Sequence, residues 1–199
     1  MSLQHIRAIS NAREDMHQMT GASDKELCEV LRESGESREL AFAELYRRYA
    51  SRIYQYARRI IHRDMEAEDI LQETFLKFIQ ILEKEAVIEN VPAYLLRIAR
   101  NLSLRSESKK QVVVPIEDYH AIFNEAPMEA EEASQIITMA LDLLPKDQRE
   151  ALVLQVYGGL SYIEIAEVMG VPMTTVRNWI VRSKDKMRKI MTPYFASTE

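Results

Sequence analysis

Basic and amide side chains near the C-terminus have spacings suited to binding nucleic acid. Residues 172–191 contain six Lys or Arg residues and one acid, Asp185. Val176 and Ile180 recur at helical spacing, which leaves Arg177 and Asn178 on the other faces of the same helix. Guanidinium groups on an exposed helix bind phosphates, and both guanidinium and amide groups can hydrogen-bond to base edges. The chemistry expected of this segment is therefore recognition of DNA.

Two consecutive helices are predicted to position these side chains. Ser161 and Glu164 form a Ser-x-x-Glu capping box that begins a helix over residues 161–169. Gly170 ends this helix, and the basic helix follows over residues 172–190. This pattern is typical of a helix-turn-helix, in which the second helix lies in the major groove. An ordinary helical hairpin with a solvated basic face stays open as the alternative.

Charge is distributed unevenly along the rest of the chain. The formal net charge is −5, which by itself argues against a nucleic-acid partner. Residues 94–110, however, carry five cations against Glu107, while residues 111–135 carry six acids and no Lys or Arg. Two basic segments separated by an acidic spacer can bind DNA locally even when the sum is negative.

No constellation of catalytic residues is visible in the sequence. The four His residues are scattered without metal-ligand spacing, and Cys28, the one cysteine, is expected to be a small, half-buried residue of a helix. We therefore expect no enzyme activity, no metal or other cofactor, and no small-molecule substrate. No apolar run approaches the roughly 20 residues that span a bilayer, so we expect a cytoplasmic protein without direct membrane insertion.

The composition predicts an all-α fold. Glycine and proline are scarce, with 5 and 6 residues, and apolar residues repeat at helical spacing on both sides of the acidic segment. We expect two small helical domains joined by an acidic linker, a helical bundle over residues 23–110 and a helix-turn-helix domain over residues 134–199. Residues 1–22 are expected to form a flexible tail, and residues 111–133 the linker.

Six motifs in this order resemble those of bacterial RNA polymerase sigma factors, in the extracytoplasmic-function (ECF) group of the sigma-70 family. Three lie in the first half and three in the second half of the chain: FAELYRRY (42–49), EAEDILQETF (66–75), LLRIARNL (95–102), LPKDQRE (144–150), GLSYIEIAE (159–167) and TVR (175–177). A lone helix-turn-helix is weak support for such a resemblance, whereas several motifs in family order, split by an acidic segment, are strong support.

The resemblance implies three sets of contact residues. Asp69, Gln72 and Glu73 match the segment that docks on the clamp helices of the largest subunit of core RNA polymerase. Residues that match the reader of the downstream (minus-ten) promoter element are Arg97, Arg100 and Asn101. Residues that match the recognition helix for the upstream (minus-thirty-five) element are Thr174, Thr175, Arg177, Asn178 and Arg182. The implied function is an alternative sigma factor that directs polymerase to specific promoters and assists promoter melting, with an anti-sigma factor as a regulator.

The sequence departs from the family pattern at a few positions, and other functions stay open. Thr174 stands where Gly is usual, and Trp179 stands where Arg is usual, which removes one expected phosphate contact. A stand-alone helix-turn-helix regulator with a sensor half is the main alternative, and it would need a ligand pocket in the first half. A mimic that sequesters an anti-sigma factor is a third interpretation, although such a mimic would not need both basic segments.

Overall fold

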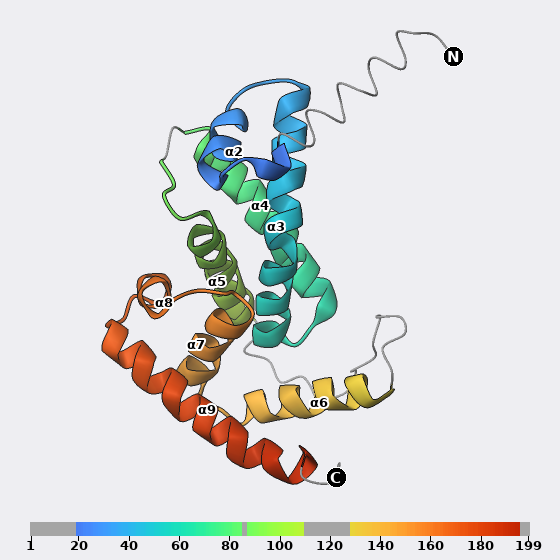
Figure 1. The fold of residues 1–199 in the computed structure, drawn as a ribbon, viewed down its shortest axis with the longest axis vertical. Coiled ribbons are helices and arrows are strands. Elements are labelled where there is room, and N and C mark those ends of the chain that lie inside the picture. The colour runs from blue at the N-terminus through green and yellow to red at the C-terminus, as the bar shows by residue number, and fades with distance from the viewer. Residues whose placement is uncertain (1–18, 85–86, 110–127, 196–199) are drawn as a thin grey trace.

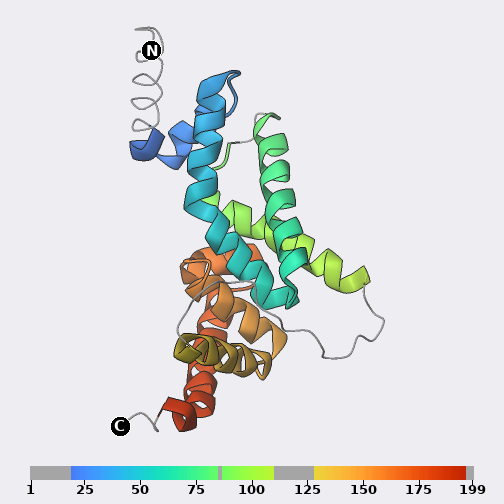
Figure 2. The same ribbon diagram turned by 90° about the vertical axis from the view of Figure 1, so that its right-hand side faces the viewer.

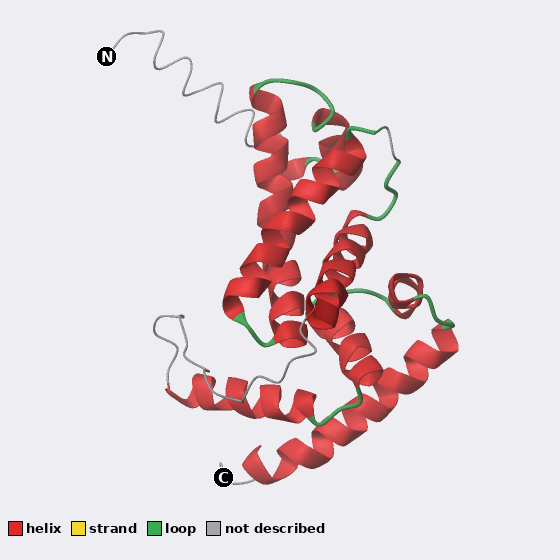
Figure 3. Cartoon of the chain, turned by 180° about the vertical axis from the view of Figure 1, so that it is seen from behind, coloured by secondary structure: helices red, strands yellow, loops and turns green. Residues whose placement is uncertain are grey.

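The computed structural model describes residues 19–84, 87–109 and 128–195, and the regular elements in these ranges are all helices (Figure 3). The first half of the chain forms α2 (Asp24–Val30), α3 (Glu36–Ile61), α4 (Asp64–Leu82) and α5 (Val91–Lys109). The second half forms α6 (Met128–Asp142), α7 (Lys146–Val156), α8 (Tyr162–Met169) and α9 (Met173–Phe195). The predicted all-α fold with two helical regions is confirmed. None of the helices in the described ranges is both long enough and apolar enough to cross a membrane.

Local capping interactions fix several of the helix boundaries. Ser23 and Glu26 form a capping box at the start of α2, with the Ser23 N–H donating to the Glu26 carboxylate over 2.6 Å. At the start of α5, the Asn90 Oδ1 accepts from the Ala93 N–H over 3.0 Å. Helix α3 ends at His62, which adopts a left-handed conformation with φ of 60°. These signals are local, so each of these helix boundaries is encoded within a few residues of the sequence.

Helix α3 is the central helix of the N-terminal half, on which the other helices of that half pack (Figures 1 and 2). It packs against α2, α4 and α5, and its stripe of Leu45, Ile53 and Tyr56 is almost fully buried. Phe78 of α4 and Leu95 of α5 complete the same core. Such a stripe, with polar residues on the remaining face, is what drives an amphipathic helix into a bundle.

The C-terminal half is built on the two helices α7 and α9, which pack against each other (Figure 1). Helix α7 buries Leu152, Val153 and Leu154, while α9 buries Val176 and Ile180. Helices α6 and α8 both contact α9, so three shorter helices pack along the long last one. The consequence is that α9 keeps one face in the core and the opposite face in solvent.

The two halves are in direct contact. Helix α5 packs on α8 and α3 packs on α7, and the buried apolar residues of both halves form one continuous cluster. Leu96 of α5 approaches the end of α7 so closely that a Cβ atom added at Gly158 would lie only 2.8 Å from its Cδ1 atom. The protein is therefore a two-part molecule in a closed arrangement (Figure 2).

Three sequence-based expectations differ from the structure. The sequence predicts Arg59 on the outside of α3, as for most charged residues, but it is only 9% exposed because its guanidinium lies 5.0 Å from the ring centroid of Tyr157 and hydrogen-bonds to Thr138. Of the expected tail, residues 1–18 lie outside the described ranges, but residues 19–22 pack on the first half. Of the expected linker, residues 111–127 lie outside these ranges, whereas α6 already begins at Met128. Acidic composition suggested a linker there, but it is also favoured in the first turn of a helix.

A buried carboxylate of α3 holds the arginine that links this helix to the chain before it. Glu44 is 6% exposed and accepts hydrogen bonds from Arg47 and Arg48, which together hold its pKa at about 2. Arg48 also pairs with Asp24 over 2.8 Å and donates to the carbonyl oxygen of Ala22 over 2.7 Å. Arg48 thus links α3 both to α2 and to the segment that precedes α2.

We expect Arg48→Met to lower the free energy of unfolding by roughly 2–3 kcal/mol, because it leaves a buried carboxylate and several carbonyls short of donors. Arg47→Met is the matched control, since Arg47 bonds to the same carboxylate but its side chain is 65% exposed; we expect a clearly smaller loss of stability. Urea unfolding followed by circular dichroism measures both. Equal losses for the two variants would contradict this account of Arg48.

Candidate nucleic-acid interface

A tight connection between α8 and α9 sets the geometry of the basic helix. The Ser161 Oγ accepts from the Glu164 N–H, and the Glu164 carboxylate accepts from the Ser161 N–H over 2.6 Å, so the predicted capping box is present. These hydrogen bonds to Ser161 lower the pKa of Glu164 below its ordinary value. Gly170 then ends α8 in the left-handed conformation with φ of 69°, which a residue without a Cβ adopts most readily. The predicted helix-turn-helix is confirmed.

The predicted DNA-contact residues of α9 lie mostly on its solvent face. Arg177, Asn178 and Arg182 are exposed, as is Thr174, whereas Thr175 is half-buried. The opposite face carries Val176 and Ile180, both at 0% exposure, and Ser183, whose hydroxyl hydrogen-bonds to the Trp179 carbonyl oxygen over 2.7 Å. An exposed face with two guanidinium groups and an amide on a rigidly packed helix is suited to phosphate and base-edge contacts.

Trp179 and Thr174, the two departures from the family pattern, differ in their surroundings. Trp179 is half-buried and packs against the apolar core. Thr174 is exposed within the first turn of α9. Trp179 therefore substitutes a packing contact for the charge that is usual at its position, while Thr174 stays available at the solvent face.

The second basic segment lies on α5, and its three predicted contact residues are not equivalent. Arg97 and Asn101 are exposed, and the Arg97 guanidinium lies 4.6 Å from the ring centroid of Tyr94. A charged residue of an amphipathic helix is expected on the outside, but Arg100 instead pairs with Glu150 of α7: its Nε donates to Oε1 over 2.8 Å and its Nη2 to Oε2 over 3.4 Å. The outward position is therefore wrong for Arg100, because its partner comes from the other half of the chain, while its contact with the minus-ten element stays a prediction.

The acidic set on α4 is fully accessible. Asp69, Gln72 and Glu73 are all exposed, and Glu73 pairs with Lys77 one turn along over 3.1 Å. Leu76, which shares this face by helical spacing, is 64% exposed. Such a combination of carboxylates and an apolar side chain is suited to a protein partner rather than to nucleic acid.

An aromatic cluster, which sequence reasoning missed, joins α3 to α4. Phe42 and Tyr46 of α3 are about one-third exposed, and their ring centroids lie 5.7 and 4.9 Å from that of Phe75 in α4. Helical spacing alone puts Phe42 in the apolar stripe of α3 and so predicts it in the core. The available signal was that the aromatic pair Phe42 and Tyr46 is spaced i, i+4, which places both on one face.

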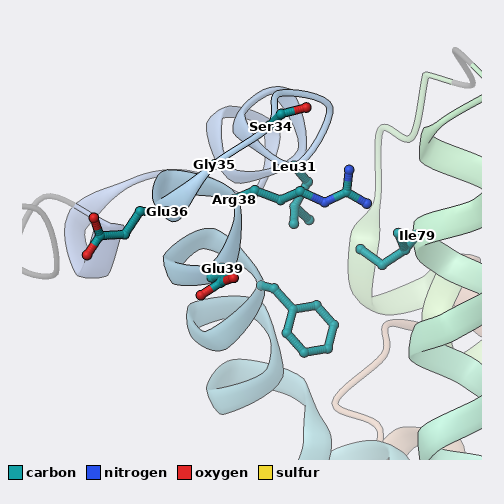
Figure 4. Close-up of a pocket in the computed structure, with 8 residues that line it drawn as sticks. Leu31, Ser34, Gly35, Glu36, Arg38, Glu39 and Ile79 are labelled. Carbon is teal, nitrogen blue, oxygen red and sulfur yellow. The ribbon is translucent and has the colours of Figure 1, made fainter.

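An open hollow lies between the turn before α3 and helix α4 (Figure 4). Leu31, Gly35 and Ile79 contribute to its lining, and Arg38 reaches across toward Ile79 and pairs with Glu83 over 2.6 Å. Glu36 points away from the hollow. Since its central cation already has a partner and the hollow is open to solvent, it does not have the enclosed, mostly apolar form of a ligand-sensing pocket.

Comparison with known protein families matches both halves of the chain. The family described as "Sigma-70 region 2" matches residues 45–111, and "Sigma-70, region 4" matches residues 134–187. The first match contains α5 and most of α3 together with α4; the second contains the helix-turn-helix. The two matches occur in the order that the sequence motifs predicted.

Individual relatives agree with this result. The chain is 32% identical over 190 residues to the RNA polymerase sigma-H factor of Pseudomonas aeruginosa, covering 88% of this chain and 97% of that protein. It is 32% identical over 167 residues to the ECF RNA polymerase sigma factor SigE of Mycolicibacterium smegmatis, covering 78% of this chain but 63% of that protein. It is 28% identical over 169 residues to the ECF RNA polymerase sigma factor SigW of Bacillus subtilis, covering 75% of this chain and 88% of that protein.

Two solved structures share the fold. CnrH, solved in complex with the cytosolic domain of CnrY, superposes with a TM-score of 0.64 at 23% identity, covering 85% of this chain and 97% of that one. The sigma factor RpoE of Bartonella quintana, solved in complex with the anti-sigma factor NepR, superposes with a TM-score of 0.62 at 22% identity, covering 76% of this chain and 96% of that one. With both family regions present in order on a matching all-helical fold, this chain belongs to the sigma-70 family of RNA polymerase sigma factors, in its ECF group.

Proposed function

We propose that this chain acts as an alternative sigma factor, which binds core RNA polymerase, directs it to promoters with two DNA elements, and assists melting of the downstream element. The observation that carries the proposal is the solvent face of α9, where Arg177, Asn178 and Arg182 project from a helix locked in place by the capped α8 and the Gly170 turn. Its family consists of transcription initiation factors rather than classical enzymes. The protein itself therefore supplies binding energy and catalyses no reaction, and it acts in the cytoplasm.

The three contact sets receive separate roles in this proposal. Residues 134–199 bind the minus-thirty-five element through Thr174, Thr175, Arg177, Asn178 and Arg182. Residues 23–110 bind the minus-ten element through Arg97, Arg100 and Asn101. Asp69, Gln72 and Glu73 dock on the clamp helices of the largest polymerase subunit, and the exposure of all three supports this assignment. The structure of the B. quintana relative with NepR supports an anti-sigma factor as a further partner of this chain.

A stand-alone helix-turn-helix regulator is not favoured. It would need only the C-terminal half, yet the first half matches a sigma-70 region as well. The hollow between α3 and α4 is open to solvent and its central cation, Arg38, already pairs with Glu83, so it does not have the enclosed form of a sensor pocket.

Adding this chain to core RNA polymerase is expected to start transcription at a defined subset of promoters in a pool of genomic fragments. Core polymerase alone is the control, and sequencing of the transcript starts reads out both promoter elements. The proposal is wrong if saturating protein leaves initiation at the level of core polymerase alone.

Reversing the charge of the acidic face tests the polymerase contact. We expect Asp69→Lys with Glu73→Lys to abolish binding to core polymerase, because two exposed carboxylates become cations while the buried side of α4 is unchanged. Glu29→Lys with Glu33→Lys makes the same charge change on exposed residues in and just after α2 and should bind normally. A pull-down with core polymerase measures both, and circular dichroism checks that helicity is kept. Undiminished binding of the first variant contradicts the assignment.

Arg177→Ala should weaken use of the upstream element by about tenfold or more, the worth of one good bidentate base contact. Lys189→Ala is the control, because it removes the same charge from an exposed position three turns further along α9. Transcription from promoters mutated in either element separates the two effects. An equal loss at the upstream and downstream elements would be inconsistent with a base-reading role for Arg177.

A further inference from the structure

One carboxylate connects the two halves of the molecule at the centre of their contact. Glu150 of α7 is 3% exposed and accepts hydrogen bonds from the Tyr56 hydroxyl of α3 and from the Arg100 Nε of α5, both over 2.8 Å. Both donors belong to the N-terminal half, whereas Glu150 belongs to the C-terminal half. We propose that Glu150 is a latch, which holds the free protein closed and withholds Arg100 from DNA until the halves separate; this inference rests on the function proposed above.

Polar contacts surround the latch, beside the apolar contact of Leu96 with the end of α7. The Asn90 amide, at the start of α5, donates to the Glu164 carboxylate in the capping box of α8. The His62 Nε2 lies 3.2 Å from the Asp142 Oδ1 of α6. Arg59 reaches Thr138 of α6 and the ring of Tyr157. We call this set of contacts between residues 56–100 and residues 138–164 the seam. The polar part of this contact favours separation more than a purely apolar contact would, since each polar group regains water on opening.

The closed form leaves some of its polar atoms unsatisfied. Within the described ranges, the buried side-chain atoms without a hydrogen-bond partner include the Nε of Arg59 and the Nε of Arg149, both at the seam. A buried donor without an acceptor disfavours the state that buries it, and opening would hydrate both atoms. The attraction between Arg100 and Glu150 is likewise offset by the cost of removing both charges from water. These costs offset part of the stability of the closed form, and a ligand that binds only the open form shifts the balance further towards opening.

DNA is suited to be that ligand because it competes for the same guanidinium. A phosphate group offers Arg100 paired oxygen acceptors, as the Glu150 carboxylate does. Arg97 and Asn101, which flank Arg100 on α5, are already exposed in the closed form. A strand can thus contact these two residues first, but a contact with Arg100 requires that Glu150 be displaced. The apparent affinity for the downstream element is then reduced by the fraction of molecules that are closed.

The test compares Glu150→Ala with Asp147→Ala, which removes the same charge from an exposed position one turn earlier in α7. Small-angle X-ray scattering of the free, full-length protein should give a larger radius of gyration for Glu150→Ala than for the wild type, and an unchanged value for Asp147→Ala. Binding to a single-stranded oligonucleotide carrying the downstream element should tighten by about tenfold or more for Glu150→Ala only. Equal compactness and equal DNA affinity of the two variants would overturn the latch.

A charge swap tests whether the larger radius of gyration of Glu150→Ala results from loss of the ion pair rather than from unfolding. Glu150→Arg combined with Arg100→Glu should restore the compact scattering of the wild type, because the ion pair is rebuilt with the opposite polarity, while DNA binding stays weak for lack of Arg100. If the swapped protein is as open as Glu150→Ala, the specific pair does not hold the halves together and the proposal fails. The scattering result is independent of transcription, so a chain that closes through Glu150 but never directs initiation would refute the proposed function and not the latch.

Discussion

The structure depends on the burial of the apolar stripe of α3 along its whole length. A helix of 26 residues is longer than any single neighbour, so it needs different partners at its two ends. Helix α4 runs back along α3, from the Arg58–Asp64 pair at one end to the Arg38–Glu83 pair at the other, and α2, α5 and α7 also pack on α3. Tyr56 shows the result, since its ring lies in the core of the first half and its hydroxyl donates to Glu150 of the second. The two family regions therefore share one core cluster although each has its own set of helices.

Features encoded within a few residues could be predicted from the sequence, and features that depend on distant partners could not. The capping box of Ser161 and Glu164 and the stop at Gly170 are local, and both are present as expected. Periodicity also identified the buried face of α9. Because a charged residue is usually solvated, the sequence predicts Arg59 and Arg100 on the outside. Their partners, Thr138 and Glu150, lie 79 and 50 residues further along the chain, and no spacing rule links them.

Glu150 itself carried a signal that was available in the sequence. It directly precedes four residues that are all buried, Ala151 to Leu154, in a helix whose apolar residues are not confined to one stripe. A carboxylate in such a setting is stable only with donors from elsewhere. The sequence could therefore have indicated that Glu150 needs a partner, although not that the partners are a tyrosine and an arginine of the other half.

Using Arg100 both for closure and for DNA has a consequence for selectivity. A guanidinium already held by a carboxylate is less available to any stray phosphate, so the free protein presents one fewer cation to non-specific DNA, where affinity scales with the number of phosphates neutralised. The solvent face of α9 differs in this respect, because Arg177, Asn178 and Arg182 are exposed in the closed form. In the proposed function, the α9 contact residues and Arg97 and Asn101 of α5 are thus accessible before opening, and opening adds Arg100. Separation of the halves therefore completes a downstream contact set that is already partly exposed.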